Sequence, residues 1–270
     1  MSRSSEALAA EIRCDVLEMV HRARAAHVAS SLSVADVLAV LYSEVLRHRP
    51  DDPGWAGRDR LILSKGHAAA AGYAALARSG YFGVELLEEY CENDSPLAGH
   101  VTASVDAPGV ELSTGSLGHG LPVGAGMALH ASRAAAGHRV FVVLSDGECD
   151  EGSTWEAALF SAHHNLANLC VVVDYNRIQS FGRVEDVLGL EPLADKWRAF
   201  GWDVQEVDGH DHGALQSALG ATHPTKPRVI VARTVKGKGL SFMEDDLLWH
   251  YRSPDDEQLA KALAEVRNSS

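Results

Sequence analysis

The stretch Val140-Phe-Val-Val-Leu-Ser-Asp-Gly-Glu148 decides the fold class of this chain. Five apolar residues in an unbroken run are typical of a strand that is buried on both faces of a sheet. Three further runs have the same character: Arg60-Leu-Ile-Leu63, Leu169-Cys-Val-Val-Val173 and Val229-Ile-Val231. We therefore expect strands that lie inside the protein.

Helical patterns lie before and between these runs. Apolar residues recur at helical spacing from Leu8 to Val20, and Ser33-Val-Ala-Asp36 resembles a capping box that opens a second helix through Leu46. Further helices are expected over residues 67–79, after Gly126 through Ala136, and over 155–165 and 192–200. Alternating strands and helices predict an α/β fold, a doubly wound and mostly parallel sheet with helices on both faces. We expect one domain over residues 1–270 with a helical segment at about 1–58.

Composition excludes several classes of protein. The 270 residues are 46% hydrophobic and 23% charged, and 24 basic against 37 acidic residues give a net charge of −13. Such an acidic chain is a poor binder of nucleic acid. The apolar runs are too short to span a bilayer, and charged residues interrupt the N-terminus, so we expect neither a membrane span nor a signal peptide. Four scattered cysteines without a CxxC pair indicate a reducing compartment, and we expect a cytoplasmic protein.

Polar residues follow three of the apolar runs, at the edge of a parallel sheet where ligands bind. They are Ser64-Lys-Gly-His67, Ser145-Asp-Gly-Glu148 and Asp174-Tyr-Asn176. Asp146 and Asn176 carry hard oxygen atoms that suit Mg²⁺, and Gly147 lets a diphosphate approach the backbone. A divalent ion would also offset the repulsion between an acidic protein and a diphosphate. The alternative is that Asp146 only caps a helix that starts near Thr154.

A glycine-rich stretch, Thr114-Gly-Ser-Leu-Gly-His-Gly-Leu-Pro-Val-Gly-Ala-Gly126, opens one of the expected helices. Its spacing is not the dinucleotide fingerprint. Glycines at the start of a helix expose backbone N–H groups to an anion or a polar ring. Tight packing of the helix on the sheet is the alternative for Gly124 and Gly126.

Several histidines lie next to glycine, serine or turn segments, where a site could form. Imidazole titrates near neutral pH and moves protons, so a cluster of these residues would be catalytic. Any one of them alone is more often structural, and spacing along the chain does not show whether they meet. The candidates are His27, His67, His100, His119 and His250.

Taken together, these motifs resemble a known family. Ser145–Gly152 followed by Asn176 resembles the thiamine diphosphate motif, and the chain is similar to the N-terminal half of transketolase. The agreement in order and approximate spacing runs from His27 to His250. It is carried by Ser64-Lys-Gly-His67, Gly99-His100, Thr114-Gly-Ser-Leu-Gly118, Trp155-Glu-Ala157, Asn176-Arg-Ile178 and Val235-Lys-Gly-Lys-Gly239.

The resemblance implies a cofactor and its ligands. Mg²⁺, or Ca²⁺ or Mn²⁺ in its place, would be bound by Asp146, Asn176 and the main-chain oxygen of Ile178. Thiamine diphosphate would contact a larger set: Gly147 and His67 at the diphosphate, Gly115, Ser116 and Leu117 along the thiazolium and aminopyrimidine, and Glu148.

The resemblance also implies catalytic residues and a reaction. His27, His67, His100 and His250 would face the sugar, and Glu151 would form a polar link between paired active sites. The implied reaction transfers a two-carbon ketol unit from a ketose or its phosphate to an aldose or its phosphate. Tyr251 stands where the family often has a small residue, which would reshape the substrate channel.

A full-length relative continues into a second α/β domain that carries the glutamate pairing with the aminopyrimidine ring, whereas this sequence ends at Ser270. The resemblance therefore predicts one subunit of a split enzyme. It would be inactive alone and completed by a C-terminal, pyrimidine-binding subunit, with α2β2 as the expected assembly. Sugars or sugar phosphates would be the substrates.

Three alternatives remain open from the sequence. The chain could belong to another thiamine diphosphate enzyme, such as a deoxyxylulose-phosphate synthase or the α chain of a 2-oxo acid dehydrogenase. It could be a non-catalytic scaffold for its partner. A nicotinamide dehydrogenase is disfavoured because the dinucleotide fingerprint is missing.

Overall fold

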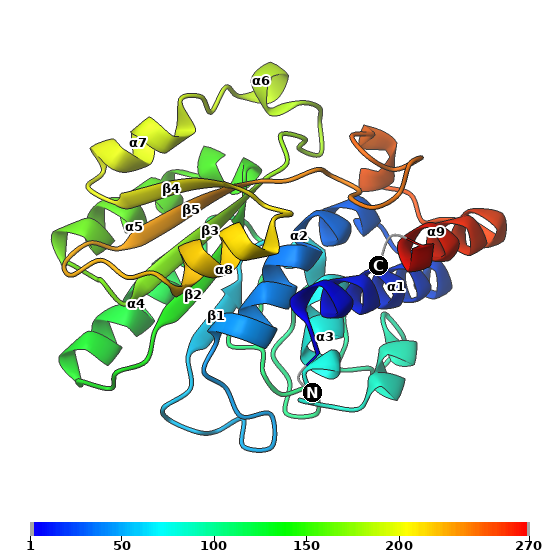
Figure 1. Cartoon of the computed structure of the whole chain (residues 1–270), viewed down its shortest axis with the longest axis horizontal. Helices are drawn as coiled ribbons and strands as arrows, with labels where there is room; N and C mark the ends of the chain where they lie inside the picture. Colours follow the sequence, from blue (N-terminus) through cyan, green and yellow to red (C-terminus); the bar gives the residue numbers. More distant parts are fainter. Residues whose placement is uncertain (1–2, 269–270) are drawn as a thin grey trace.

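A parallel sheet lies at the centre of the computed structural model, which describes residues 3–268 (Figure 1). Over this range the sheet has five strands in the order β1-β2-β3-β5-β4. Every neighbouring pair is parallel. Residues 1–2 and 269–270 of the expected domain lie outside the described residues. The bounds are Arg60–Leu63 (β1), Val140–Ser145 (β2), Leu169–Tyr175 (β3), Asp203–Asp208 (β4) and Arg228–Arg233 (β5).

The four expected strands are confirmed, because alternate residues of each one pack into opposite apolar cores. Phe141 and Val143 of β2 join the core formed with α1, α2, α3 and α8. Val140, Val142 and Leu144 of the same strand join the core formed with α4, α5 and α7. This two-sided burial produces the unbroken apolar runs in the sequence. The α/β fold with helices on both faces is therefore shown.

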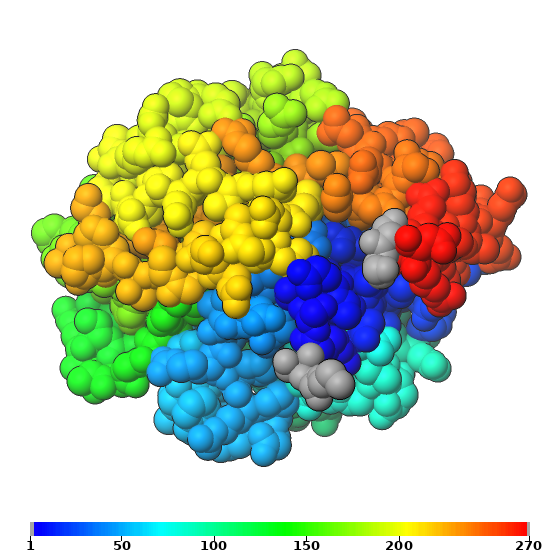
Figure 2. All heavy atoms as spheres, in the orientation of Figure 1, coloured from blue at the N-terminus to red at the C-terminus, as the bar shows by residue number. Residues whose placement is uncertain are grey.

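Most of the expected helices are present. Gly80, at φ +89°, follows the end of α3, and Gly201, at φ +90°, follows α7. Ala262 and Val266 of α9 belong to the same core as α1, and the two helices lie together at the surface (Figure 2). The α-helices are Ser5–Ala23 (α1), Val28–Val40 (α2), Ala69–Arg78 (α3), Gly120–Arg133 (α4), Gly152–His163 (α5), Val184–Val187 (α6), Leu193–Ala199 (α7), His212–Gly220 (α8) and Asp256–Asn268 (α9).

Two features of the fold differ from expectation. Strand β4 has no apolar run, because it lies at the sheet edge and exposes Gln205 and Glu206. The expected capping box is wrong, since α2 already begins after His27, and Ser33 and Asp36 are buried inside it. A π-helical turn, Leu41–Val45, extends this helix close to the expected end at Leu46.

One helical stretch, Val28–Val45, is long and apolar enough to cross a membrane by composition alone. In the structure 83% of it is buried inside the protein. It packs between α1, α3 and α8 in the larger core. The apolar character of this stretch is therefore accounted for by its place in the core.

Candidate active site

A cleft of about 930 Å³, open to solvent, lies where β2 and β3 end. Ser145 of β2 is in register with Asp174 of β3, so Asp146 and Asn176 follow neighbouring strands, as expected from the sequence. Eight residues from the sequence-based site line this cleft: His67, Leu117, Asp146, Gly147, Glu151, Asn176, Ile178 and His250.

Asp146 is the acidic group at the floor of the cleft. Only 2% of the residue is exposed, and its carboxylate accepts hydrogen bonds from Gly147 N (2.8 Å) and Arg177 N (2.7 Å). Burial and the nearby Asp174 carboxylate raise the pKa of Asp146 to about 6. The interpretation of Asp146 as the cap of the helix near Thr154 is wrong, because Glu151 holds the N-cap position of α5.

Asn176 and Ile178 place two more oxygens beside Asp146. Asn176 is 4% exposed, and its Oδ1 accepts from Ile178 N at 3.1 Å. The main-chain oxygen of Ile178 accepts from Lys236 Nζ at 2.7 Å, and the same Nζ lies 2.8 Å from His250 Nδ1. Burial and the ammonium of Lys65 lower the pKa of Lys236 to about 8. One buried lysine therefore bridges the oxygen-rich and imidazole parts of the cleft.

Lys65, which lines the cleft, forms a buried ion pair with Asp174. Lys65 Nζ also donates to Ser30 O (2.8 Å) and Ser33 Oγ (3.1 Å), while the carboxylate accepts from Ser33 and Thr234. Burial raises the pKa of Asp174, but Lys65 and these hydrogen bonds outweigh it, so the pKa lies below its ordinary value. The pair ties α2, β1, β3 and the end of β5 together under the site.

Glu148, which the resemblance places among the cofactor-binding residues, is bound to the glycine-rich loop in this structure. The residue lies outside the lining of the cleft and is fully buried, with its carboxylate accepting from Ser64 Oγ, Gly118 N (3.0 Å) and Ser145 N (3.4 Å). Burial raises the pKa of Glu148 to about 7. The short helical turn Gly147–Asp150 directs this side chain away from the cleft, where it holds the glycine-rich loop.

The glycine-rich loop packs tightly against the end of β1. A Cβ on Gly66 would lie 2.6 Å from Gly115 N, and one on Gly120 would lie 2.1 Å from Ser64 Oγ. The sequence suggested that Gly124 and Gly126 allow tight packing of the helix on the sheet. This is confirmed for Gly124, where an added Cβ would lie 2.5 Å from Val142, and is wrong for Gly126, which faces open space. Close backbone approach therefore fixes the loop over the cleft.

We predict that Gly66→Ala displaces this loop and destabilises the protein by about 1–3 kcal/mol, because the new methyl group meets backbone atoms that cannot move aside. Denaturant unfolding measures the change. The matched control is Gly126→Ala, an open position inside α4, which we expect to gain up to about 1 kcal/mol. Equal stability of the two variants would contradict the tight packing of the loop.

Four of the five candidate histidines meet in one cluster. The ring of His27 lies with its centroid 4.8 Å from that of His67, 5.9 Å from His100 and 5.1 Å from His250, and His67 lies 4.8 Å from His100. His27 N also donates to His250 O at 2.9 Å. His119 is exposed at the start of α4 and is not part of the cluster.

The cluster favours neutral imidazoles. Burial and the neighbouring rings lower the pKa of His27 and of His67 to about 4 each. Burial, Lys236 and His27 lower the pKa of His250 to about 3. At neutral pH these three rings are therefore uncharged, and each has one N–H donor and one acceptor nitrogen. His100 is the exposed member, so the cluster opens to solvent on its side.

The remaining expected residues lie around the mouth. Glu151 is exposed and lines the cleft, and Gly115 packs against the His100 ring, where a Cβ would lie 3.1 Å away. Ser116 is exposed in the same loop. The sequence alone assigned no role to Lys236 and Ser30, which also line the cleft. The Val235-Lys-Gly-Lys-Gly239 motif contained Lys236, but nothing in its spacing showed that this lysine is buried.

Comparison with known proteins agrees with this geometry. Residues 4–262 match the family model described as "Transketolase, thiamine diphosphate binding domain". The chain is 40% identical to one of the subunits of the apulose-4-phosphate transketolase of Phocaeicola vulgatus, covering 93% of this chain and 89% of that protein. It is 41% identical to the 6-deoxy-6-sulfo-D-fructose transketolase subunit SqwG of a Clostridium species, covering 94% and 93%.

Solved structures give the same result. Transketolase from Leishmania mexicana superposes with a TM-score of 0.93 at 30% identity, over 99% of this chain and 42% of that one. Transketolase from Campylobacter jejuni superposes with a TM-score of 0.90 at 31% identity, over 97% and 42%. The chain thus spans about two-fifths of these solved chains. With the cleft and its histidine cluster, these matches show that the chain belongs to the transketolase family, through its thiamine diphosphate binding domain.

Proposed function

We propose that this chain is the thiamine diphosphate-binding subunit of a split transketolase, which transfers a two-carbon ketol unit from a ketose or its phosphate to an aldose or its phosphate. The main observation behind the proposal is the cleft, which is lined by a buried carboxylate, a buried amide, His67 and His250. The rings of His27 and His100 pack against these two histidines. Two relatives of nearly the same length are named as transketolase subunits.

The oxygen atoms in the cleft fit a divalent ion that is bound together with a diphosphate. Asp146 is a buried carboxylate that accepts from two backbone amides, and the Ile178 carbonyl already faces a cation, the Lys236 ammonium. Among residues 3–268 no three His, Cys, Asp or Glu side chains form a metal site by themselves. Mg²⁺ suits this arrangement because it is commonly bound by one or two protein groups plus substrate phosphate. Asp146, Asn176 and the Ile178 oxygen would hold it.

The chain's own residues would position the sugar and move protons. Thiamine diphosphate, when bound, supplies the carbon nucleophile that adds to the ketose carbonyl. Lys236 Nζ faces His250 Nδ1, so the proton of the neutral His250 ring lies on Nε2, which can donate to a substrate oxygen. His27 and His67 are neutral because their pKa values are about 4, so each keeps an acceptor nitrogen for a hydrogen bond from a sugar hydroxyl.

We propose that a second, pyrimidine-binding subunit covers the open side of the cleft in an α2β2 assembly, with Glu151 at the contact. Glu151 and Phe181 line the mouth, and Phe181 is 84% exposed. Val187, which also lines the cleft, and the adjacent Leu188 are exposed as well, and grouped exposed apolar side chains are typical of a surface that another chain covers. The four free cysteines support a reducing, cytoplasmic location.

The experiment that tests the proposed function compares the chain alone with the chain mixed with its partner subunit. We expect no ketol transfer by the chain alone, and turnover once the partner, Mg²⁺ and thiamine diphosphate are present. The donors assayed should include a ketose phosphate, apulose 4-phosphate and 6-deoxy-6-sulfo-D-fructose, because relatives are named for the last two. Full turnover by the chain alone would contradict the split assembly, and pyruvate decarboxylation without ketol transfer would contradict the reaction.

A further inference from the structure

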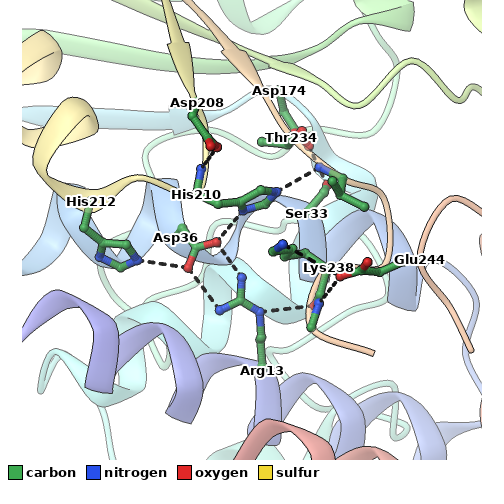
Figure 3. Close-up of polar contacts among 12 residues, drawn as sticks. Arg13, Ser33, Asp36, Asp174, Asp208, His210, His212, Thr234, Lys238 and Glu244 are labelled. Carbon is green, nitrogen blue, oxygen red and sulfur yellow. Dashed lines mark hydrogen bonds and ion pairs between the residues drawn. The ribbon is translucent and has the colours of Figure 1, made fainter. Parts of the chain in front are cut away.

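A second cluster of charged side chains lies outside the cleft, around Asp36 of α2 (Figure 3). Asp36 is 4% exposed, and its two carboxylate oxygens accept from Arg13 of α1 at 3.0 and 2.5 Å. They also meet His210 Nδ1 at 2.6 Å and His212 Nε2 at 3.1 Å. The cluster thus joins α1 and α2 to the loop that follows β4.

His210 has a second partner that His212 lacks. The backbone N–H of Val235 donates to His210 Nε2 at 2.8 Å. Because Nε2 accepts this bond, the ring proton lies on Nδ1 and is donated to the Asp36 carboxylate. The side chain of His210 therefore connects a buried carboxylate to one backbone amide next to the cleft.

The same cluster holds the other end of this backbone segment. Arg13 Nε donates to Lys238 O at 3.3 Å, so Val235 and Lys238 are both bound by side chains that converge on Asp36. Between them, Gly237 N donates to Ala29 O at 3.0 Å, and a Cβ on Gly237 would lie 2.4 Å from Met243 O. Residues 235–238 are thus fixed from one side and tightly packed on the other.

The residue that this segment presents to the cleft is Lys236. It is 1% exposed, and its ammonium bonds to Ile178 O at 2.7 Å and faces His250 Nδ1 at 2.8 Å. A long side chain is aimed accurately only when its backbone is held, so the bond to the neighbouring Val235 amide bears directly on where Nζ lies.

We propose that His210 is a positioning residue for the cleft: held in one tautomer by Asp36, it binds the Val235 amide and thereby fixes Lys236 over the Ile178 oxygen and His250. The consequence for cofactor binding rests on the proposed function. The role of His210 in fixing residues 235–238 is independent of the proposed function, because it concerns one backbone segment of this chain.

The test uses amide hydrogen exchange of the full chain without cofactor or partner, followed residue by residue. We expect His210→Ala to speed exchange at Val235 by at least about tenfold, because the N–H loses its acceptor. His210→Gln, whose side-chain oxygen can accept the same bond, should restore most of the protection. The matched control is His212→Ala, which also removes a partner of Asp36 but leaves the Val235 bond intact.

The proposal would be overturned if exchange at Val235 were unchanged in His210→Ala. It would also be overturned if exchange rose equally in His210→Ala and His212→Ala, because an equal rise reports only a general loosening around Asp36. In the complex with partner, His210→Ala should raise the apparent KM for thiamine diphosphate by at least about tenfold and change kcat less. If the exchange result is as expected but the KM for thiamine diphosphate is unchanged, the proposed function of the cleft is contradicted, whereas the role of His210 in fixing residues 235–238 is retained.

Discussion

Asp146→Asn is expected to weaken the Mg²⁺-dependent binding of thiamine diphosphate by at least about 100-fold, because it removes the charged ligand of the ion and leaves the fold unchanged. Asn has nearly the same volume, and its side-chain oxygen can still accept from Gly147 N or Arg177 N. Isothermal titration of the cofactor into the complex with partner, with and without Mg²⁺, measures the effect.

The matched control is Asp106→Asn, the same substitution at an exposed position outside the cleft. We expect it to keep wild-type affinity. The titration also has a defined pH dependence. With the pKa of Asp146 at about 6, a proton competes with the metal below that pH, so wild-type affinity should fall as the pH decreases from about 6. Retained Mg²⁺-dependent binding in Asp146→Asn would show that the ion lies elsewhere.

His27→Asn is expected to lower ketol transfer by about 10²- to 10⁴-fold while leaving cofactor affinity within about threefold, because His27 is the ring at the centre of the proton-moving cluster. Asn is chosen because His27 has a φ of +71°, a conformation that Asn adopts more readily than most residues. Steady-state kinetics of the complex with partner give kcat, and calorimetry gives the cofactor affinity.

His119→Asn is the control for this change, since His119 is exposed at the start of α4 and outside the cluster. We expect it to leave kcat unaltered. If His27→Asn retained full activity, the histidine cluster would have no catalytic part, and the interpretation of the chain as a scaffold for its partner would be favoured.

The central part of the fold was predictable from the sequence because strands that are buried on both faces have unbroken apolar runs. Strands β2 and β3 are apolar along most of their length, and their order in the sheet brings Asp146 beside Asn176. Edge strand β4 has no such apolar run, since much of it is exposed to water. The Ser33-Val-Ala-Asp36 pattern gave a wrong prediction because the two side chains bind distant residues instead of capping a helix. Ser33 donates to Asp174, and Asp36 accepts from Arg13, and neither contact can be predicted from the local sequence.

The site was predictable only where residues follow neighbouring strands. The orientation of Glu148 depends on the helical turn after β2, and the buried position of Lys236 depends on contacts with segments far away in the chain. The histidine cluster is assembled from four separate segments, so its existence follows from tertiary packing and from nothing in the spacing of the residues. The roles assigned to these residues stay predictions.

The most direct test of the proposed metal and cofactor site is a crystal structure of the complex with partner, thiamine diphosphate and Mn²⁺, with the metal located by its anomalous scattering. We predict a single peak at about 2.0–2.4 Å from an Asp146 carboxylate oxygen, Asn176 Oδ1 and the main-chain oxygen of Ile178, with the diphosphate completing the shell. A fully occupied cofactor whose metal lies away from these three oxygens, or no cofactor in the cleft at all, would contradict this prediction.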